Sequence, residues 1–310
     1  MARSPKAAID MHPQDWLLLA FLSILWGGSF FFVGAAEREL PPMTIVLARV
    51  SLGALMLLPF VRVFGSALPR RLIDWLPFAG MGLLNNVIPF SLFATAMTYI
   101  PSGMASVLNA TTPLFGVLVL ASFGEERLIA RRVVGVVIGL IGVVILREPG
   151  PAAPGQTVGI LLCLGAALSY GFSGLWARRM LAGVPPITSA AGQLVSSSVM
   201  MAVIAGAVDQ PWTLPMPSVA TWLSLVGIAA LSTALAYIVF FRILARSGAT
   251  NVMLVTLLIP VTAILLGWLV LGEPLGAREI AGALVIGSAL IAIDGRIFGW
   301  LRIRLAAGKA

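Results

Sequence analysis

Long apolar stretches recur along the whole chain and are separated by short polar connectors. Because a bilayer core about 30 Å thick takes about 20 apolar residues as a helix, this pattern predicts ten membrane-spanning helices. Their predicted ranges are 16–36, 43–64, 75–98, 102–123, 130–146, 157–177, 187–208, 218–241, 250–271 and 279–298. The connectors carry turn residues, such as Pro41-Pro42 and Pro185-Pro186, and none could hold a soluble domain. We therefore expect an all-α membrane protein.

Composition narrows the class of protein further. Of the 310 residues, 59% are hydrophobic and 10% are charged, whereas soluble domains carry about 25% charged residues. A soluble enzyme, a disordered chain and a secreted disulfide scaffold are therefore excluded. Cys163 is the only cysteine and His12 the only histidine. We accordingly expect no disulfide, no metal site and no cofactor.

Basic residues are distributed unevenly between the two predicted faces of the membrane. Of the 20 Lys and Arg residues, Arg38, Arg147 and Arg278 fall on one side and Arg49 falls inside a span. All the others lie on the side that holds both termini. Because cytoplasmic loops carry an excess of Lys and Arg, both termini are predicted to be cytoplasmic. The net charge of +8 then reflects orientation, and we expect no nucleic-acid partner.

The two halves of the chain resemble each other. Shifts of 144 and 147 residues superimpose polar, aromatic and proline positions. The matches are Trp26–Ser29 with Tyr170–Ser173 at 144, and Phe93 with Phe240, Pro113 with Pro260 and Glu126 with Glu273 at 147. Each unit, 1–150 and 151–310, holds five predicted spans, so the second enters the membrane from the opposite face. We therefore predict two inverted five-helix repeats, as in many secondary transporters, with a solute site between them.

Three prolines fall in the middle of predicted spans. A proline at position i leaves the carbonyl of residue i−4 without its helical hydrogen bond and kinks the helix. The predicted helix-kink residues are Pro89, Pro113 and Pro260, and the freed carbonyls belong to Asn85, Asn109 and Thr256. Irregular backbone at this depth is tolerated where it is buried in protein or lines a wet cavity. These polar residues either contact a solute or only satisfy the kinked backbone, and both interpretations stay open.

Polar and aromatic residues at helical spacing complete the candidate site. Ser173 and Trp176 share a face of the sixth span, and Trp26, Phe90 and Tyr237 lie deep in other spans. The candidate substrate-binding residues are Trp26, Ser29, Arg49, Asn85, Phe90, Asn109, Tyr170, Ser173, Trp176, Tyr237 and Thr256. An aromatic surface with a few polar groups suits an amphipathic small molecule, although serine stripes more often indicate tight helix packing. The nearly uniform fifth and tenth spans are expected at the periphery.

Arg49 is the charged residue that lies plainly inside a predicted span. It follows Pro42 by seven residues, which places it about 10 Å into the membrane. It either attracts a substrate carboxylate or reaches the outer interface, and we favour the second role because a tilted helix and a long side chain suffice for it. All twelve Asp and Glu residues fall at span ends or in loops. A proton relay of deeply buried carboxylates is therefore not predicted.

Several motifs resemble the ten-span EamA-type branch of the drug/metabolite transporter superfamily. They are Trp26-Gly27-Gly28-Ser29 in the first span, Arg49 in the second, Pro113 followed by Gly124-Glu125-Glu126, and Pro260 followed by Gly272-Glu273-Pro274. The resemblance extends over residues 16 to 298 and, within the branch, is best to bacterial exporters of aromatic and other amino acids, the YddG type. The chain departs from its own repeat where Gln193 replaces the second copy of Arg49.

This resemblance implies a secondary active or facilitative exporter in the bacterial inner membrane. Its expected substrates are small amphipathic metabolites, which include amino acids and, among these, aromatic amino acids. Its substrate is a small molecule, and it works by alternating access. The alternatives are export of drugs or other metabolites, and a non-transporting membrane scaffold. Gly171–Gly174 matches the GxSG motif of intramembrane serine proteases, but His12 precedes the first span and cannot serve as its base. We therefore predict no enzymatic activity.

A topology reporter inserted after Gly150 should lie outside the cytoplasm, because five spans precede this connector. Alkaline phosphatase fused there should be active, and green fluorescent protein should be dark. A fluorescent fusion with inactive phosphatase would contradict both the span count and the orientation.

Overall fold

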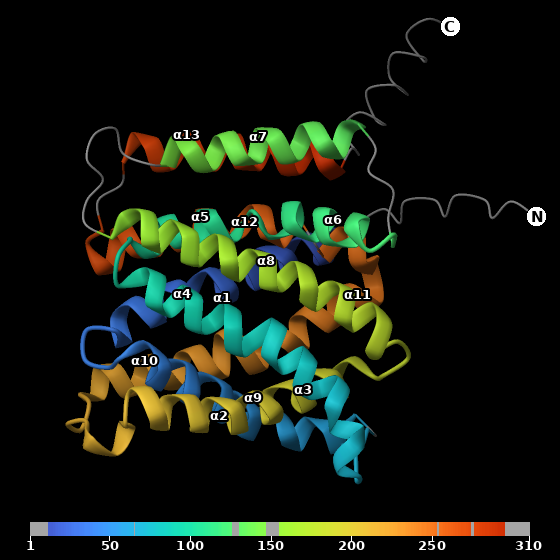
Figure 1. Cartoon of the computed structure of the whole chain (residues 1–310), viewed down its shortest axis with the longest axis vertical. Helices are drawn as coiled ribbons and strands as arrows, with labels where there is room; N and C mark the ends of the chain where they lie inside the picture. The colour runs from blue at the N-terminus through green and yellow to red at the C-terminus, as the bar shows by residue number, and fades with distance from the viewer. Residues whose placement is uncertain are drawn as a thin grey trace, which may run out of the picture.

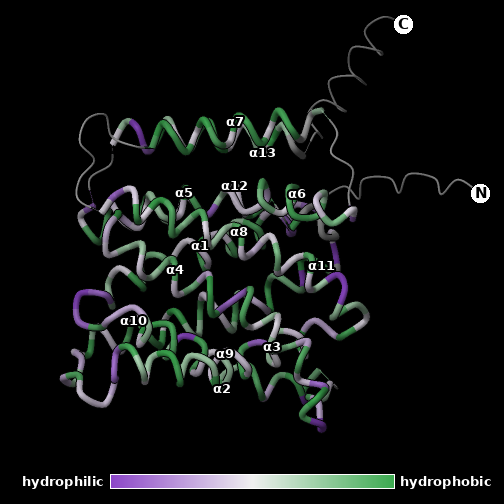
Figure 2. Tube along the Cα trace, viewed as in Figure 1, coloured by the Kyte–Doolittle hydropathy of each residue, from purple (hydrophilic) through white to green (hydrophobic). Residues whose placement is uncertain are grey.

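The structure is a computed structural model that describes residues 12–64, 66–125, 130–146, 155–252, 254–273 and 276–294. The described residues form helices and turns and contain no β-strand. Figure 1 shows the helices in roughly parallel rows that are stacked along the long axis of the molecule. Figure 2 shows that the helices are mainly hydrophobic, with many hydrophilic residues in the loops at both ends of the rows. This is the arrangement of an all-helical membrane protein.

The helices follow the predicted spans in order along the chain. The first half contains α1 (Pro13–Ala36), α2 (Pro42–Val63), η1 (Leu72–Trp75), α3 (Leu76–Gly82), η2 (Leu83–Val87), α4 (Ile88–Met97), α5 (Ser102–Asn109), α6 (Thr112–Ser122) and α7 (Ala130–Leu146). The second half contains α8 (Gln156–Met180), α9 (Pro186–Val208), η3 (Pro211–Thr213), α10 (Val219–Ala229), η4 (Ala230–Leu235), α11 (Ala236–Val252), α12 (Val255–Leu266), η5 (Gly267–Leu271) and α13 (Ala277–Asp294). η1 and η3 are 3₁₀ turns, whereas η2, η4 and η5 are π-helical turns within longer helices.

Within the described residues, seven helical segments are long and apolar enough to cross a membrane. They are Pro13–Ala36, Pro42–Val63, Leu72–Met97, Ser102–Ser122, Gln156–Met180, Pro186–Val208 and Val219–Leu244. Val133–Leu146 and Leu258–Leu271 are shorter apolar helices and coincide with the fifth and ninth predicted spans. The chain is therefore a multi-pass helical membrane protein.

α11 is longer than the sequence predicts. The apolar pattern ends the eighth span at residue 241, but the helix continues to Val252. Ile243 and Val252 are fully buried, and Arg246 Nε lies 3.0 Å from Asp15 Oδ1 at the start of α1. These contacts with neighbouring helices extend the helix beyond its apolar run, which hydropathy alone does not reveal.

Proline and polar side chains set the starts of several helices. Pro42 and Pro186 stand in the first turns of α2 and α9, where a backbone N–H has no helical partner to lose. Ser218 caps α10, because its Oγ accepts a hydrogen bond from Thr221 N at 3.3 Å. Gly272 ends η5 with φ 71°, a left-handed conformation that glycine adopts without strain.

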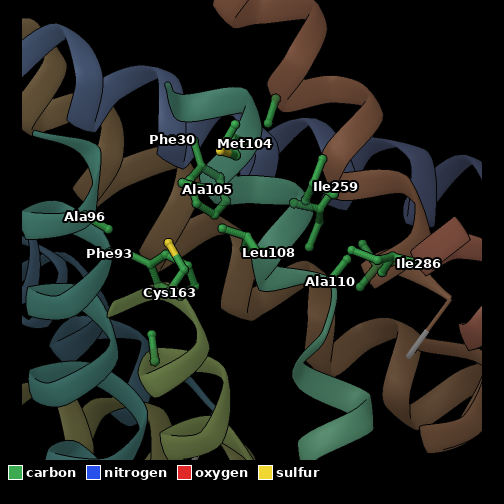
Figure 3. Close-up of a cluster of buried hydrophobic side chains, with 14 of the residues drawn as sticks. Phe30, Phe93, Ala96, Met104, Ala105, Leu108, Ala110, Cys163, Ile259 and Ile286 are labelled. Carbon is green, nitrogen blue, oxygen red and sulfur yellow. The ribbon is translucent and has the colours of Figure 1, made fainter. Parts of the chain in front are cut away.

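Two clusters of buried apolar side chains pack the helices together. The first includes Phe30 of α1, Phe93 of α4 and Leu108 of α5, and Figure 3 shows Phe30 beside Met104 and Phe93 beside Cys163. The second cluster lies mainly among α2, α9 and α10. In a bilayer the lipid tails are as apolar as these side chains, so the clusters stabilise the bundle through close packing rather than through removal from water.

Glycines allow the closest helix contacts. A Cβ atom at Gly27 would collide with Thr262 and approach the backbone of Ala263, so α1 and α12 are close at this point. A Cβ atom at Gly82 would lie 2.7 Å from the carbonyl oxygen of Gln193, so α3 and α9 are close there. Small residues at such points favour helix association in membranes. Both contacts join the first half of the chain to the second.

α7 and α13 form a pair at one end of the molecule, beyond α5, α6 and α12 (Figure 1). A Cβ atom at Gly142 would lie 2.7 Å from Ile286 Cγ1, and one at Gly282 would lie 2.5 Å from Leu146 Cδ2. The two helices therefore pack closely against each other. This position agrees with the expectation that the fifth and tenth spans lie at the periphery.

The three predicted kink prolines occupy different kinds of position. Pro89 stands in the first turn of α4, directly after the π turn η2, and Pro113 stands in the first turn of α6, after a short turn at Ala110 and Thr111. Pro260 lies inside α12, which continues through it as a helix. Pro89 and Pro113 thus coincide with interruptions of the regular helix, whereas Pro260 does not.

Three carboxylates cap helix N-termini at the same end of the bundle, the left end in Figure 1. Glu39 accepts hydrogen bonds from Ser218 N through Oε2 and from Ser218 Oγ through Oε1, both at 2.7 Å. Asp209 Oδ2 accepts from Thr44 N at 2.7 Å and from Thr44 Oγ1 at 2.9 Å. Glu273 accepts from Ser102 N at 3.0 Å, Ser102 Oγ at 2.8 Å and Gly103 N at 3.2 Å. The hydrogen bonds from Ser218 hold the pKa of Glu39 below its usual range. Each cap joins the first half of the chain to the second. Glu126, the repeat counterpart of Glu273, lies outside the described residues.

Candidate solute-binding site

Polar side chains from four spans meet at Asn85, in the π turn η2. Asn85 Nδ2 donates a hydrogen bond to Gln193 Oε1 of α9 at 2.9 Å and lies 3.5 Å from the Tyr237 hydroxyl of α11. The single O–H of Ser173 in α8 is shared between two acceptors, Asn85 Oδ1 at 3.2 Å and the backbone oxygen of Tyr170 at 2.8 Å. A single amide thus connects the third predicted span to the sixth, seventh and eighth.

Arg49 points into the bundle. Its guanidinium carbon lies 3.6 Å from the centroid of the Phe90 ring of α4, and its Nε donates to Thr233 Oγ1 of η4 at 3.3 Å. Thr233 is buried and lies about midway along the α10–α11 helix. The sequence analysis favoured a side chain that reaches the outer interface. That interpretation is wrong, because an aromatic face and a hydroxyl deep in the bundle hold the side chain there.

The π turns η2 and η4 occupy equivalent places in the two halves. η2 spans Leu83–Val87 and η4 spans Ala230–Leu235, and a shift of 147 residues carries 83 to 230 and 87 to 234. In η2 the wide turn lies directly before a proline: Pro89 has no N–H to donate to the carbonyl of Asn85. The N–H of Ile88 bonds to the carbonyl of Leu83, five residues earlier, rather than to that of Leu84 as in an α-helix. π turns within α-helices frequently lie at functional sites.

Arg49 and Gln193, which a shift of 144 residues superimposes, each bind a π turn of the opposite half. Arg49 binds Thr233 in η4, and Gln193 binds Asn85 in η2. The two contacts have the same form but different chemistry, because one partner is charged and the other is neutral. The charge in the middle of the bundle is therefore placed asymmetrically.

Aromatic residues surround this polar group. Tyr237 stacks on Phe241 with centroids 6.0 Å apart, and Phe241 packs edge-on against Phe240 at 5.3 Å. Trp26 of α1 lies 5.5 Å from Phe240. Tyr170 stacks on Phe93 at 6.3 Å. Of the predicted site residues, Arg49, Asn85, Phe90, Tyr170, Ser173 and Tyr237 are thus brought together, and Trp26 joins them through two phenylalanines; we call these seven residues the central cluster.

The other four candidate residues lie elsewhere. Trp176 donates from Nε1 to Pro77 O at 2.9 Å and packs against Gly80, so it fastens α8 to the start of α3. Ser29, Asn109 and Thr256 lie in α1, α5 and α12, three helices that pack on one another. The sequence pattern predicts all four as deep residues, and Trp176 contacts α3 rather than the central cluster.

Four polar residues next to Asn85 and Arg49 are not among the predicted site residues. Thr233 holds Arg49, and Gln193 holds Asn85. Asn86 Nδ2 donates to Ser197 Oγ at 3.0 Å, and both residues are fully buried. A signal was present: a shift of 147 residues superimposes Asn86 on Thr233. Among the described residues, no group of three or more His, Cys, Asp or Glu side chains could hold a metal ion.

Comparison with known proteins identifies the family. The sequence profile of the EamA-like transporter family matches residues 14–147 and again residues 157–293. The chain belongs to this family. It is a transporter rather than an enzyme. Each half of this EamA-like chain contains one of the two profile matches.

Several relatives of this EamA-like transporter are known. The uncharacterized transporter YvbV of Bacillus subtilis is 30% identical over 289 residues, which cover 90% of each chain. The uncharacterized inner membrane transporter YedA of Escherichia coli is 29% identical over 89% of this chain and 90% of its own length. A probable amino-acid metabolite efflux pump of Salmonella typhimurium is 25% identical over 96% of this chain and 99% of its own length. One solved crystal structure shares the fold, with a TM-score of 0.64 and 20% identity over 91% of this chain and 96% of its own.

Replacing Asn85 by alanine should destabilise this EamA-like transporter by about 1–3 kcal/mol, because it leaves the buried Gln193 carbonyl without its donor. Cys163 provides the measurement, because it is the sole cysteine and is fully buried. Its reaction with a fluorogenic maleimide on heating should reach the midpoint at a lower temperature than in the wild type. The control is Ser198→Ala, which removes a hydroxyl that bonds within its own helix; equal midpoints for both variants would show that Asn85 does not connect the spans.

Proposed function

We propose that the chain is an exporter of small amphipathic metabolites, amino acids including aromatic ones among them, that works by alternating access. In this proposal ten spans form two inverted five-helix halves, residues 1–150 and 151–310, in the bacterial inner membrane with both termini in the cytoplasm. The name of the Salmonella relative, a probable amino-acid metabolite efflux pump, favours amino acids over drugs or other metabolites of the superfamily.

The pattern of helix contacts supports two inverted halves. α1 packs on α12 of the second half, and α8, its counterpart, packs on α5 and α6 of the first. α2 packs on its own counterpart α9, and α7 packs on α13. Contacts that map onto each other when the halves are exchanged are what two similar units of opposite orientation produce. The double match of the family profile supports the same organisation.

The central cluster is the observation that carries the proposed function. It combines a guanidinium, an amide, two phenols and several aromatic faces midway along the helices, and it lies where the two halves contact each other. Polar and ionisable groups at this depth are costly and mark solute pathways in membrane proteins. A membrane scaffold has no need of a buried charge such as Arg49, since close packing and hydrogen bonds between neutral side chains hold helices together at lower cost.

The three carboxylate caps indicate which end of the bundle is closed in this conformation. They connect the halves at the end that orientation by Lys and Arg places outside the cytoplasm. We infer that this end is held closed in the structure and that outward release of a solute requires these hydrogen bonds to separate. At the opposite end Arg246 pairs with Asp15 across the halves, and Arg179 Nε pairs with Glu125 Oε1 at 2.9 Å.

Glu37, at the end of α1, is the described carboxyl best suited to exchange a proton during transport. Burial raises its pKa to about 7, and its Oε1 is buried with no hydrogen-bond partner among the described residues. The neutral form of this acid is favoured below that pH and is lost as the pH rises through it. Proton coupling, if the exporter is secondary active, would then act at the outer end rather than in the middle of the bundle.

Purified protein in liposomes preloaded with phenylalanine should take up labelled phenylalanine by exchange. Tyr237→Phe removes the hydroxyl beside Asn85 and should lower uptake about fivefold, the effect of losing one hydrogen bond to a solute. Tyr99→Phe is the matched control, because Tyr99 is exposed at a helix end. Absence of exchange for phenylalanine, leucine and threonine in wild-type liposomes would contradict amino-acid export, and equal uptake by the two variants would contradict this position of the site.

A further inference from the structure

Arg49 has unused hydrogen-bonding capacity. A guanidinium presents five N–H donors, of which Nε engages Thr233 while one face of the group covers the Phe90 ring. Among the described residues, the terminal Nη1 and Nη2 groups make no hydrogen bond and no ion pair. These two nitrogens form the planar fork that binds a carboxylate or phosphate through two parallel hydrogen bonds. The side chain is therefore held through Nε and the Phe90 ring, and its two terminal nitrogens have no hydrogen-bond partner among the described residues.

The positive charge of Arg49 also lacks an acidic partner among the described residues. Their acidic residues are Asp15, Glu37, Glu39, Asp74, Glu125, Asp209, Glu273, Glu279 and Asp294. All of them lie in the first or last turn of a helix or in a connector, and Glu39, Asp209 and Glu273 are engaged in capping. A charge at this depth costs at least about 2.5–3.5 kcal/mol, which the face of one phenylalanine offsets only in part.

The surroundings of Arg49 offer little to a cation. The positive charge of Arg49 repels a second cation, and the amide oxygens of Gln193 and Asn85 each already accept one hydrogen bond. Tyr170 and Tyr237 are near enough to the guanidinium to interact with it electrostatically, and both keep part of their surface accessible. Their rings provide apolar surface beside the fork of Arg49. The chemistry of these side chains therefore suits an anionic group and a hydrophobic body.

We propose that Arg49 is the specificity-determining residue for solutes with a carboxylate and an apolar or aromatic body, and that an amino group is tolerated but not required. The proposal rests on the proposed function and narrows its substrate class to amphipathic organic anions, with amino acids as members that carry an additional ammonium. The repeat counterpart Gln193 is neutral, so the molecule has one such anion site rather than two.

Binding can be measured independently of transport with four related solutes. Phenylalanine, 3-phenylpropionate, phenethylamine and phenylalaninamide share a phenylalkyl body and differ in the carboxylate and the amine. Each is titrated against full-length protein while the temperature at which Cys163 becomes reactive is recorded. Phenylpropionate and phenylalanine should raise this temperature, and the two solutes without a carboxylate should not.

Variants of Arg49 then test its role. Arg49→Gln should weaken the response to both carboxylates at least about tenfold, the effect of losing a charged hydrogen bond, while Arg49→Lys should retain part of it. Arg62→Gln is the matched control, since Arg62 is an exposed arginine of the same helix. Three results would each overturn the proposal. They are a response to phenethylamine as large as that to phenylpropionate, no response to either carboxylate, and an unchanged response to the carboxylates in Arg49→Gln. Failure of the proposed function would instead appear as Arg49-dependent binding without exchange in liposomes.

Discussion

The lipid around this protein offers no hydrogen bonds, so every polar group in its spans must find a partner inside the bundle. Asn85 with Gln193 meets this requirement, and Arg49 meets it in part through Thr233; each contact joins the first half of the chain to the second. The same groups that a solute would need are thus the groups that hold the halves in register. In the proposed function, one set of side chains would therefore link solute binding to a change in the contact between the halves.

The two ends of the bundle are held by different chemistry. At one end carboxylates cap the N-termini of α2, α5 and α10, where the helix dipole adds to the hydrogen bonds. At the other end Arg179 and Glu125 form an ion pair between partly exposed side chains, which contributes little stability in water, whereas Arg246 pairs with the buried Asp15. The capped end is therefore held by hydrogen bonds to backbone and hydroxyl groups, and the other end by ion pairs between side chains.

The sequence predicts the helices well and the contacts between them less well. Apolar runs locate helix in each predicted range, because the thickness of the bilayer fixes their length. The pattern cannot reveal that α11 continues to Val252, since a contact with Asp15 on another helix causes this. The same limit applies to the site. Pro89 marks the π turn that contains Asn85, but the inward direction of Arg49 depends on Phe90 and Thr233, which lie on other spans.

The central claim is that the central cluster is reached by water and solute rather than sealed as packing. The most direct test is Tyr237→Cys, which places a thiol on the side of α11 that faces Asn85, at a position that is only partly buried, with the native Cys163 as an internal control that is fully buried. A membrane-impermeant thiol reagent should modify Cys163-only protein negligibly and the variant readily, and a transported amino acid should slow that reaction. A variant thiol as unreactive as Cys163 from both sides of the membrane, with or without solute, would contradict the account.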